Sequence, residues 1–76
     1  MDIGRAIREI ATQRNMTQAD IARHTGLPDA HVTQLWNSKI YDPRASILCR
    51  IAISLQVSPS EIFNLAMQYP HQKDKD

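Results

Sequence analysis

The segment TQADIARHTGLPDAHVTQLW, from Thr17 to Trp36, restricts the possible folds more than any other part of the chain. Two short helical patterns meet there at Gly26, and Pro28 follows two residues later. Glycine permits the left-handed backbone conformation that ends a helix abruptly, and proline suits the first turn of a helix because its missing N–H has no acceptor there. The segment therefore predicts two helices joined by a tight turn.

Hydrophobic spacing and end signals predict three further helices around that pair. Apolar residues three and four apart indicate a helix from about Ile3 to Arg14 and another from about Ala45 to Leu55. The residues SPSE at 58–61 have the form of a capping box with proline at the first helical position, which predicts a last helix ending near Met67. No stretch alternates as a β-strand does, so we expect an all-α chain of five short helices.

Local residues also predict how the central helices begin and end. Asn15 suits the left-handed position that closes the first helix. Thr17 can cap the second helix, and Asp20 lies near the positive end of its dipole. Residues 1–67 are expected to form one domain, followed by a flexible tail, 68–76, in which alternating charges leave no apolar face.

Length and composition limit the class of protein. A chain of 76 residues with one cysteine has no internal disulfide and depends on apolar packing. No histidine and cysteine cluster has zinc-finger spacing, so no cofactor is expected. No run of apolar residues is long enough for a membrane span and the first residues do not form a secretion signal, so we expect a cytoplasmic protein. No catalytic constellation or phosphate-binding glycine loop is present, which argues against an enzyme.

The helix pair from Thr17 to Trp36 and the helices predicted around it resemble the Cro and C1-type repressor family of helix-turn-helix regulators, also called the XRE family. The resemblance extends from about Ile3 to Ala66 and includes MTQADIA, VTQLWNSK, DPR and ILCRIAISLQVSPSEIF. It implies a five-helix lambda-repressor-like domain in which the second and third helices form the helix-turn-helix. It also implies a transcription regulator that binds double-stranded DNA, most simply as a repressor, with the third helix in the major groove.

The resemblance implies DNA contacts position by position. Gln18 falls where the family contacts a phosphate from the first helix of the motif. The family reads base edges at the positions held here by Pro28, Asp29, Ala30, Thr33 and Gln34, and it contacts the DNA backbone at those held by Asn37, Lys39 and Arg44.

The chemistry of the third helix suits these roles unequally. Gln34 can form a paired hydrogen bond with adenine, and Thr33 can bond a base or place its methyl group against thymine. His31 is either a donor to guanine or phosphate or an ordinary surface residue. Asp29 fits better as a charge that stabilises the helix than as a base reader, and Ala30 offers only a methyl group.

The chain departs from the family pattern at a few positions. The family commonly pairs an arginine late in the first helix with a glutamate after the third, and Ala11 and Trp36 stand there instead. We expect the ring and the small methyl group to fill that volume by apolar packing. Gln56 replaces a preferred glycine, which costs about 1 kcal/mol if its backbone is left-handed. Cys49 is expected to be a small hydrophobic core residue of the fourth helix.

One such domain reads only a few base pairs, and a net charge of +1 gives little nonspecific affinity. We therefore expect a homodimer that sets two recognition helices about one DNA turn apart on a palindromic operator. The apolar residues left over for its interface are Ile53, Leu65, Met67 and Tyr69. The alternative is a protein-interaction module, an adaptor or antitoxin with little DNA binding, against which the polar third helix argues. No small-molecule ligand is expected.

Overall fold

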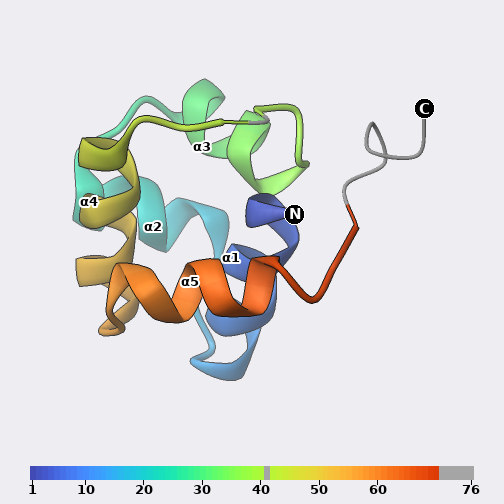
Figure 1. The fold of residues 1–76 in the computed structure, drawn as a ribbon. Coiled ribbons are helices and arrows are strands. Elements are labelled where there is room, and N and C mark those ends of the chain that lie inside the picture. Colours follow the sequence, from blue (N-terminus) through green and yellow to red (C-terminus); the bar gives the residue numbers. More distant parts are fainter. Residues whose placement is uncertain (41, 71–76) are drawn as a thin grey trace.

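The computed structural model describes residues 1–40 and 42–70. These residues form five helices and no strand (Figure 1). The helices are α1 (Ile3–Gln13), α2 (Gln18–Thr25), α3 (Asp29–Trp36), α4 (Ala45–Leu55) and α5 (Pro59–Ala66). The predicted all-α class and the number of helices are confirmed. None of the described helices combines the length and the hydropathy needed to cross a membrane.

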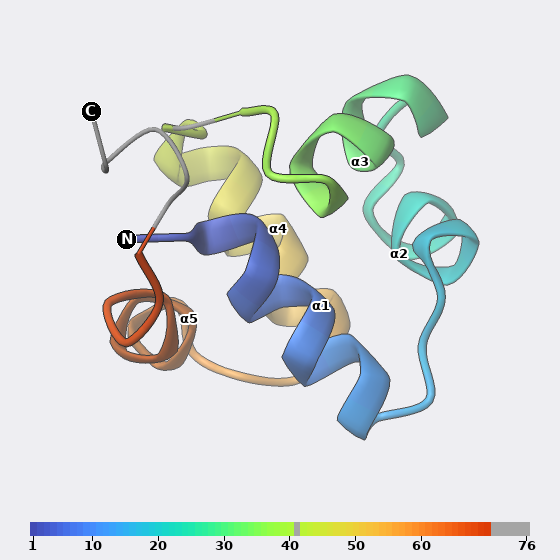
Figure 2. The ribbon, with the colours of Figure 1, turned by 90° about the vertical axis from the view of Figure 1, so that its right-hand side faces the viewer.

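All five helices share one apolar core. Helix α1 packs against α5 on one side and against α3 on the other, and α2 packs against α3 and α4 (Figure 2). Each helix contributes at least one fully buried large side chain to this core, and these are Ile7, Ile21, Leu35, Ile51, Leu55 and Ile62. Because so small a chain has a limited core, the position of α3 depends directly on this shared packing.

The amino ends of α2 and α5 are closed by reciprocal side-chain caps. The Asp20 amide donates to Thr17 Oγ1 at 3.2 Å, and the Thr17 amide donates to Asp20 Oδ2 at 2.9 Å. Ser58 and Glu61 form the same arrangement at α5, where each amide donates to the other side chain at 3.3 Å. The capping box predicted at Ser58 is confirmed, and Thr17 is the cap that its position predicted.

Left-handed backbone ends three of the helices, as the local residues predicted at Gly26 and Asn15. Gly26 has φ 75°, Asn15 has φ 58° and Gln56 has φ 61°. Gln56 therefore has the left-handed backbone on which its cost of about 1 kcal/mol depended. Ser38, after α3, also has a positive φ of 59°, which no local signal indicated.

The prediction for Cys49 was wrong, because its side chain is exposed. Leu48, Ile51, Ala52 and Leu55 form the buried stripe of α4. A residue one position after Leu48 is turned by about 100° around the helix axis, which places it outside that stripe. Trp36 does pack against the core, partly buried, in keeping with the apolar packing expected of it.

Residues 68–70 of the predicted tail continue from α5. The Gln68 amide donates to the Leu65 carbonyl at 3.0 Å, and the Tyr69 amide donates to the Ala66 carbonyl at 3.1 Å. The remainder of that predicted tail, 71–76, lies outside the described residues.

Candidate nucleic-acid interface

The turn between α2 and α3 is held by hydrogen bonds at its first residues. The Gly26 amide donates to the Ala22 carbonyl at 2.9 Å. Thr25 Oγ1 donates to the Ile21 carbonyl at 2.7 Å and accepts from the Leu27 amide at 3.2 Å. One hydroxyl thus closes α2 and fixes the start of the turn, a role for Thr25 that no local sequence signal marks.

One side of α3 is anchored and the other is open. Val32 and Leu35 are 3% and 2% exposed, so the helix cannot rotate without opening the core. The residues of the opposite side that were expected to reach DNA are all exposed, and these are Pro28, Asp29, Ala30, Thr33, Gln34 and Asn37. Helix α3 and the segment after it lie together at the top of the molecule in Figure 1.

Gln18 lies beside this open side rather than apart from it. A depression of about 220 Å³ is lined by Gln18 and Ala19 from α2 and by Asp29, Val32 and Thr33 from α3. The amides of Gln18 and Ala19 belong to the first helical turn, whose N–H groups have no acceptor within the helix. The fold therefore brings the expected phosphate contact and the expected base readers to one surface.

A negative charge also lies at this end of α2. Hydrogen bonds with the Thr17 backbone and side chain, aided by Arg23, hold the pKa of the Asp20 carboxyl below its ordinary value. Arg23 Nη2 lies 2.7 Å from Asp20 Oδ1. The ionised carboxylate stabilises the helix end and offsets part of the attraction that this end would exert on a phosphate.

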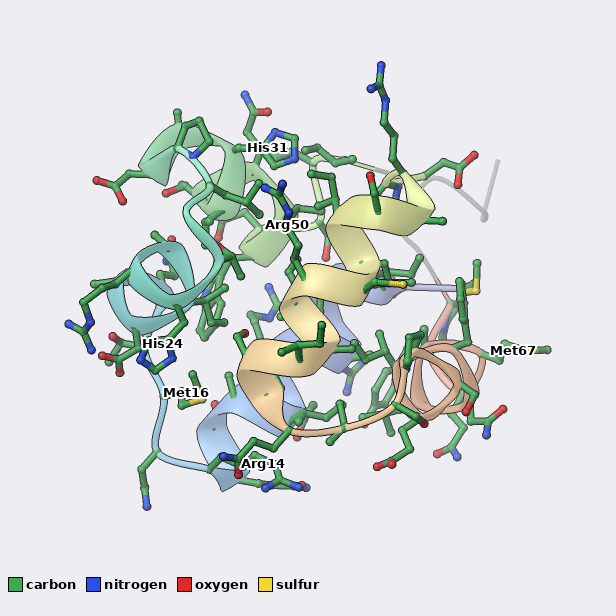
Figure 3. The ribbon with its side chains drawn as sticks, turned by 90° about the vertical axis from the view of Figure 1, so that its left-hand side faces the viewer. Arg14, Met16, His24, His31, Arg50 and Met67 are labelled. Atoms are coloured by element: carbon green, nitrogen blue, oxygen red, sulfur yellow. The ribbon has the colours of Figure 1, made fainter. Side chains whose placement is uncertain are left out.

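His31 differs from the other residues predicted to contact DNA. Its side chain is partly buried, and its Nε2 is buried without a hydrogen-bond partner in the described part of the chain. Figure 3 shows the imidazole at the side of α3 that faces α4 and Arg50. Residue 31 is four positions before the buried Leu35, so it lies at the flank of the anchored stripe and not at the centre of the open side.

The backbone contacts expected after α3 are also exposed. Lys39 and Arg44 both present exposed side chains on the segment that leads from α3 to α4. The Lys39 amide donates to the Gln34 carbonyl at 2.8 Å, which ties this segment to the last turn of α3. Arg44 is the residue that precedes α4, and its carbonyl accepts from the Leu48 amide at 3.0 Å.

The amino end of α1 holds the carboxyl end of α3. Asp2 caps α1 by accepting from the Arg5 amide at 3.0 Å, and the same oxygen accepts from Ser38 Oγ at 2.6 Å. Arg8 Nη1 donates to the Trp36 carbonyl at 2.9 Å. We call these two long-range hydrogen bonds, together with the packing of Gly4 described next, the α1 clamp.

Gly4 lets the two helices approach within this clamp. A methyl group at that position would overlap the Leu35 carbonyl oxygen and would lie 2.6 Å from Ser38 Oγ. Only glycine therefore fits where α1 crosses the end of α3, and Figures 1 and 2 both show these two ends side by side. No local sequence signal identifies these contacts, because their partners are far apart along the chain.

The residues predicted for the dimer interface fall in two places. Met67, directly after α5, is 73% exposed, and Phe63 one turn earlier is 40% exposed. Phe63, at i, i+4 spacing from Met67, was not among the residues predicted for this interface. Leu65 packs against the core, and the Tyr69 ring lies 3.9 Å from the Arg5 guanidinium carbon. Ile53, which is 76% exposed, lies apart from them on α4, beside His24 and Arg50.

The comparisons with known proteins agree with this geometry. A family model described as the Cro/C1-type HTH DNA-binding domain matches residues 6–67. The match begins within α1 and ends one residue after α5, so it covers the turn, α3 and the surrounding core. No curated protein and no solved structure matches the chain.

Proposed function

Because the chain belongs to the family of Cro/C1-type helix-turn-helix DNA-binding domains, we propose that it represses transcription by binding a palindromic operator as a homodimer. The observation that supports this most is the contrast between the two sides of α3. One side is fixed in the core by Val32 and Leu35, while the other presents polar side chains to solvent. A helix held in this way has its base-contacting side chains in position before DNA binds.

The proposal gives the exposed residues different tasks. Gln34 and Thr33 read base edges in the major groove, Gln34 through a paired hydrogen bond to adenine. Asn37, Lys39 and Arg44 contact the backbone of the DNA after the recognition helix, and Gln18 contacts a phosphate from α2. Pro28, Asp29 and Ala30 lie at the start of α3, where they affect how the helix fits against DNA more than they recognise individual bases. His31 has the weakest support, since its Nε2 is buried.

The homodimer is proposed from the exposed apolar residues of the last helix. Ile53, also expected in this interface, is left out of the proposal because it lies apart on α4. Phe63 and Met67 form an apolar strip one helical turn apart, with Leu65 and Tyr69 next to them in the chain. Two copies joined about a twofold axis through this strip would bury it on both sides. Their recognition helices would then meet two half-sites separated by about one turn of DNA.

Selection of bound duplexes from a random DNA pool tests the proposed function. The expected result is a palindrome whose half-sites are centred about ten base pairs apart. A selection without enrichment, at low salt where phosphate contacts are strongest, would contradict sequence-specific binding. Enrichment of a single unpaired half-site would retain DNA reading and contradict the dimer.

A further inference from the structure

A second, larger depression lies at the carboxyl halves of α2 and α4. It has a volume of about 600 Å³ and is open to solvent, and we call it the α2–α4 groove. Its lining residues are His24, Thr25, Arg50, Ile53, Ser54 and Gln56. Figure 3 shows His24 on α2 and Arg50 on α4 on the same face, with Arg14 below them.

Arg50 gives the groove its positive charge. Arg50 and His24 are both exposed, and no carboxylate is among the lining residues. The nearest acidic residue of α2, Asp20, is engaged by Arg23 at 2.7 Å. In the described part of the chain no carboxylate forms an ion pair with Arg50. The guanidinium therefore presents its planar set of donors to whatever approaches the groove.

The groove also contains the most exposed large apolar side chain of the described residues. Ile53 is 76% exposed, more than Phe63, Met67 or Met1. Gln56 joins it there in a left-handed conformation that a glycine would adopt without strain. Arg50, which forms no ion pair with a carboxylate of the described residues, thus shares this surface with the exposed Ile53 side chain and with Gln56.

A second copy of this chain does not suit the groove. A twofold contact would place the grooves of both copies in one interface, which would bring the two Arg50 guanidinium groups together. Such a juxtaposition of like charges opposes association. A small anion fits poorly as well, since it would remain open to water and would leave Ile53 uncovered.

DNA bound at the recognition helix would contact a different surface from the α2–α4 groove. Gln18 and His24 stand six positions apart on α2, which corresponds to roughly 9 Å along the helix axis. The depression shared with α3 is at the Gln18 end, and the groove is at the His24 end. An occupant of the groove therefore leaves the open side of α3 accessible.

We propose that the α2–α4 groove docks an acidic segment of a partner protein. A carboxylate of the segment binds the Arg50 guanidinium, and an aliphatic or aromatic side chain packs on Ile53. This surface lies apart from the DNA-reading side, and its function does not depend on DNA binding.

Peptide selection tests the docking site without DNA. Short random peptides displayed on phage are selected against the full chain, and the affinities of enriched peptides are measured by fluorescence anisotropy. The expected peptides carry Asp or Glu close to an aliphatic or aromatic residue. Arg50→Glu and Ile53→Ser should each weaken them about tenfold or more, because each removes one of the two anchoring contacts.

Arg14→Glu is the matched control, since Arg14 is exposed on the same face but does not line the groove. Arg14→Glu should change the peptide affinity by less than about twofold. A larger change would show that peptide binding depends on the overall charge of the chain. Thermal unfolding of all variants verifies that each is folded, as expected for exposed positions. Failure to enrich acidic peptides, or equal binding to the Arg50→Glu variant, would overturn the docking site.

The same variants distinguish a partner from DNA as the occupant. Arg50→Glu and Arg14→Glu change the net charge equally, so any general electrostatic effect on operator affinity is common to both. We expect the two operator affinities to agree within about twofold. A much larger loss for Arg50→Glu would identify the groove as a DNA-backbone contact and would overturn the proposal.

Discussion

Gln34 is the residue whose proposed role can be tested most selectively. Its amide is exposed on the open side of α3, while the next residue, Leu35, is buried. Gln34→Ala should cost about 1–3 kcal/mol on the preferred operator and much less on DNA changed at the base pair that it reads. Lys39→Ala should weaken all sequences alike, because it removes a phosphate contact. Anisotropy titrations over single-base-pair variants measure both effects, and an equal loss on every DNA for Gln34→Ala would exclude it as a reader.

Asp20 makes the stability of the fold depend on pH. Hydrogen bonds with Thr17, and then Arg23, hold the pKa of its carboxyl below the ordinary value of 3.8. The folded-state pKa is thus below the unfolded-state pKa, so the carboxylate stabilises the fold above pH 3.8, and the contribution is lost as the pH falls through the folded-state pKa. Asp20→Asn should lower the free energy of unfolding near neutral pH and converge with the wild type in acid. Denaturant unfolding across this range measures it, and a constant difference at all pH values would contradict it.

At the scale of elements, the α1 clamp connects the stability of the fold to the position of the recognition helix. Gly4→Ala forces a methyl group against the Leu35 carbonyl and Ser38 Oγ. It should destabilise the fold by about 1–3 kcal/mol through overpacking and should also weaken operator binding, because the end of α3 is displaced. Thr12→Ala, at an exposed position of the same helix, is the control and should do neither. Thermal unfolding and operator titration of both variants test this. Wild-type stability of Gly4→Ala would show that the two helices do not approach so closely.

The elements also show what could be predicted from sequence. Helix ends rest on local chemistry, so Gly26, Asn15 and the capping box at Ser58 were predictable from their neighbours. The bonds of Asp2 with Ser38 and of Arg8 with Trp36 join residues 36 and 28 positions apart, and only the tertiary packing decides them. Hydrophobic periodicity alone likewise does not decide whether a residue at the edge of a helix's buried stripe faces the core or the solvent.

Two residues illustrate this second limit. Cys49 lies next to the buried stripe of α4 and was wrongly expected to be in the core. His31 lies at the edge of the stripe of α3, and its Nε2 turns inward although its position suggested the DNA side. At such boundary positions the neighbouring helix decides the outcome, and for His31 that neighbour is α4.

At the scale of the whole molecule, the proposed dimer depends on the strip of Phe63 and Met67. Met67→Lys places a charge on this strip in each copy and should lower the dimer affinity at least about tenfold, since two such charges meet across the axis. Sedimentation velocity over a range of protein concentrations measures this shift toward monomer. Ile53→Lys carries the same charge in the α2–α4 groove and should leave the dimer intact. Loss of dimer with Ile53→Lys alone would relocate the interface to the groove.

The most direct test of DNA reading by α3 is the ratio of two affinities. The chain is titrated at one fixed salt concentration with its selected palindrome and with the same duplex altered symmetrically at the base pairs facing Gln34. Two altered base pairs at about 1–3 kcal/mol each predict a preference of about thirtyfold or more for the palindrome. Equal affinities for the two duplexes would contradict the proposal that this domain recognises a specific operator.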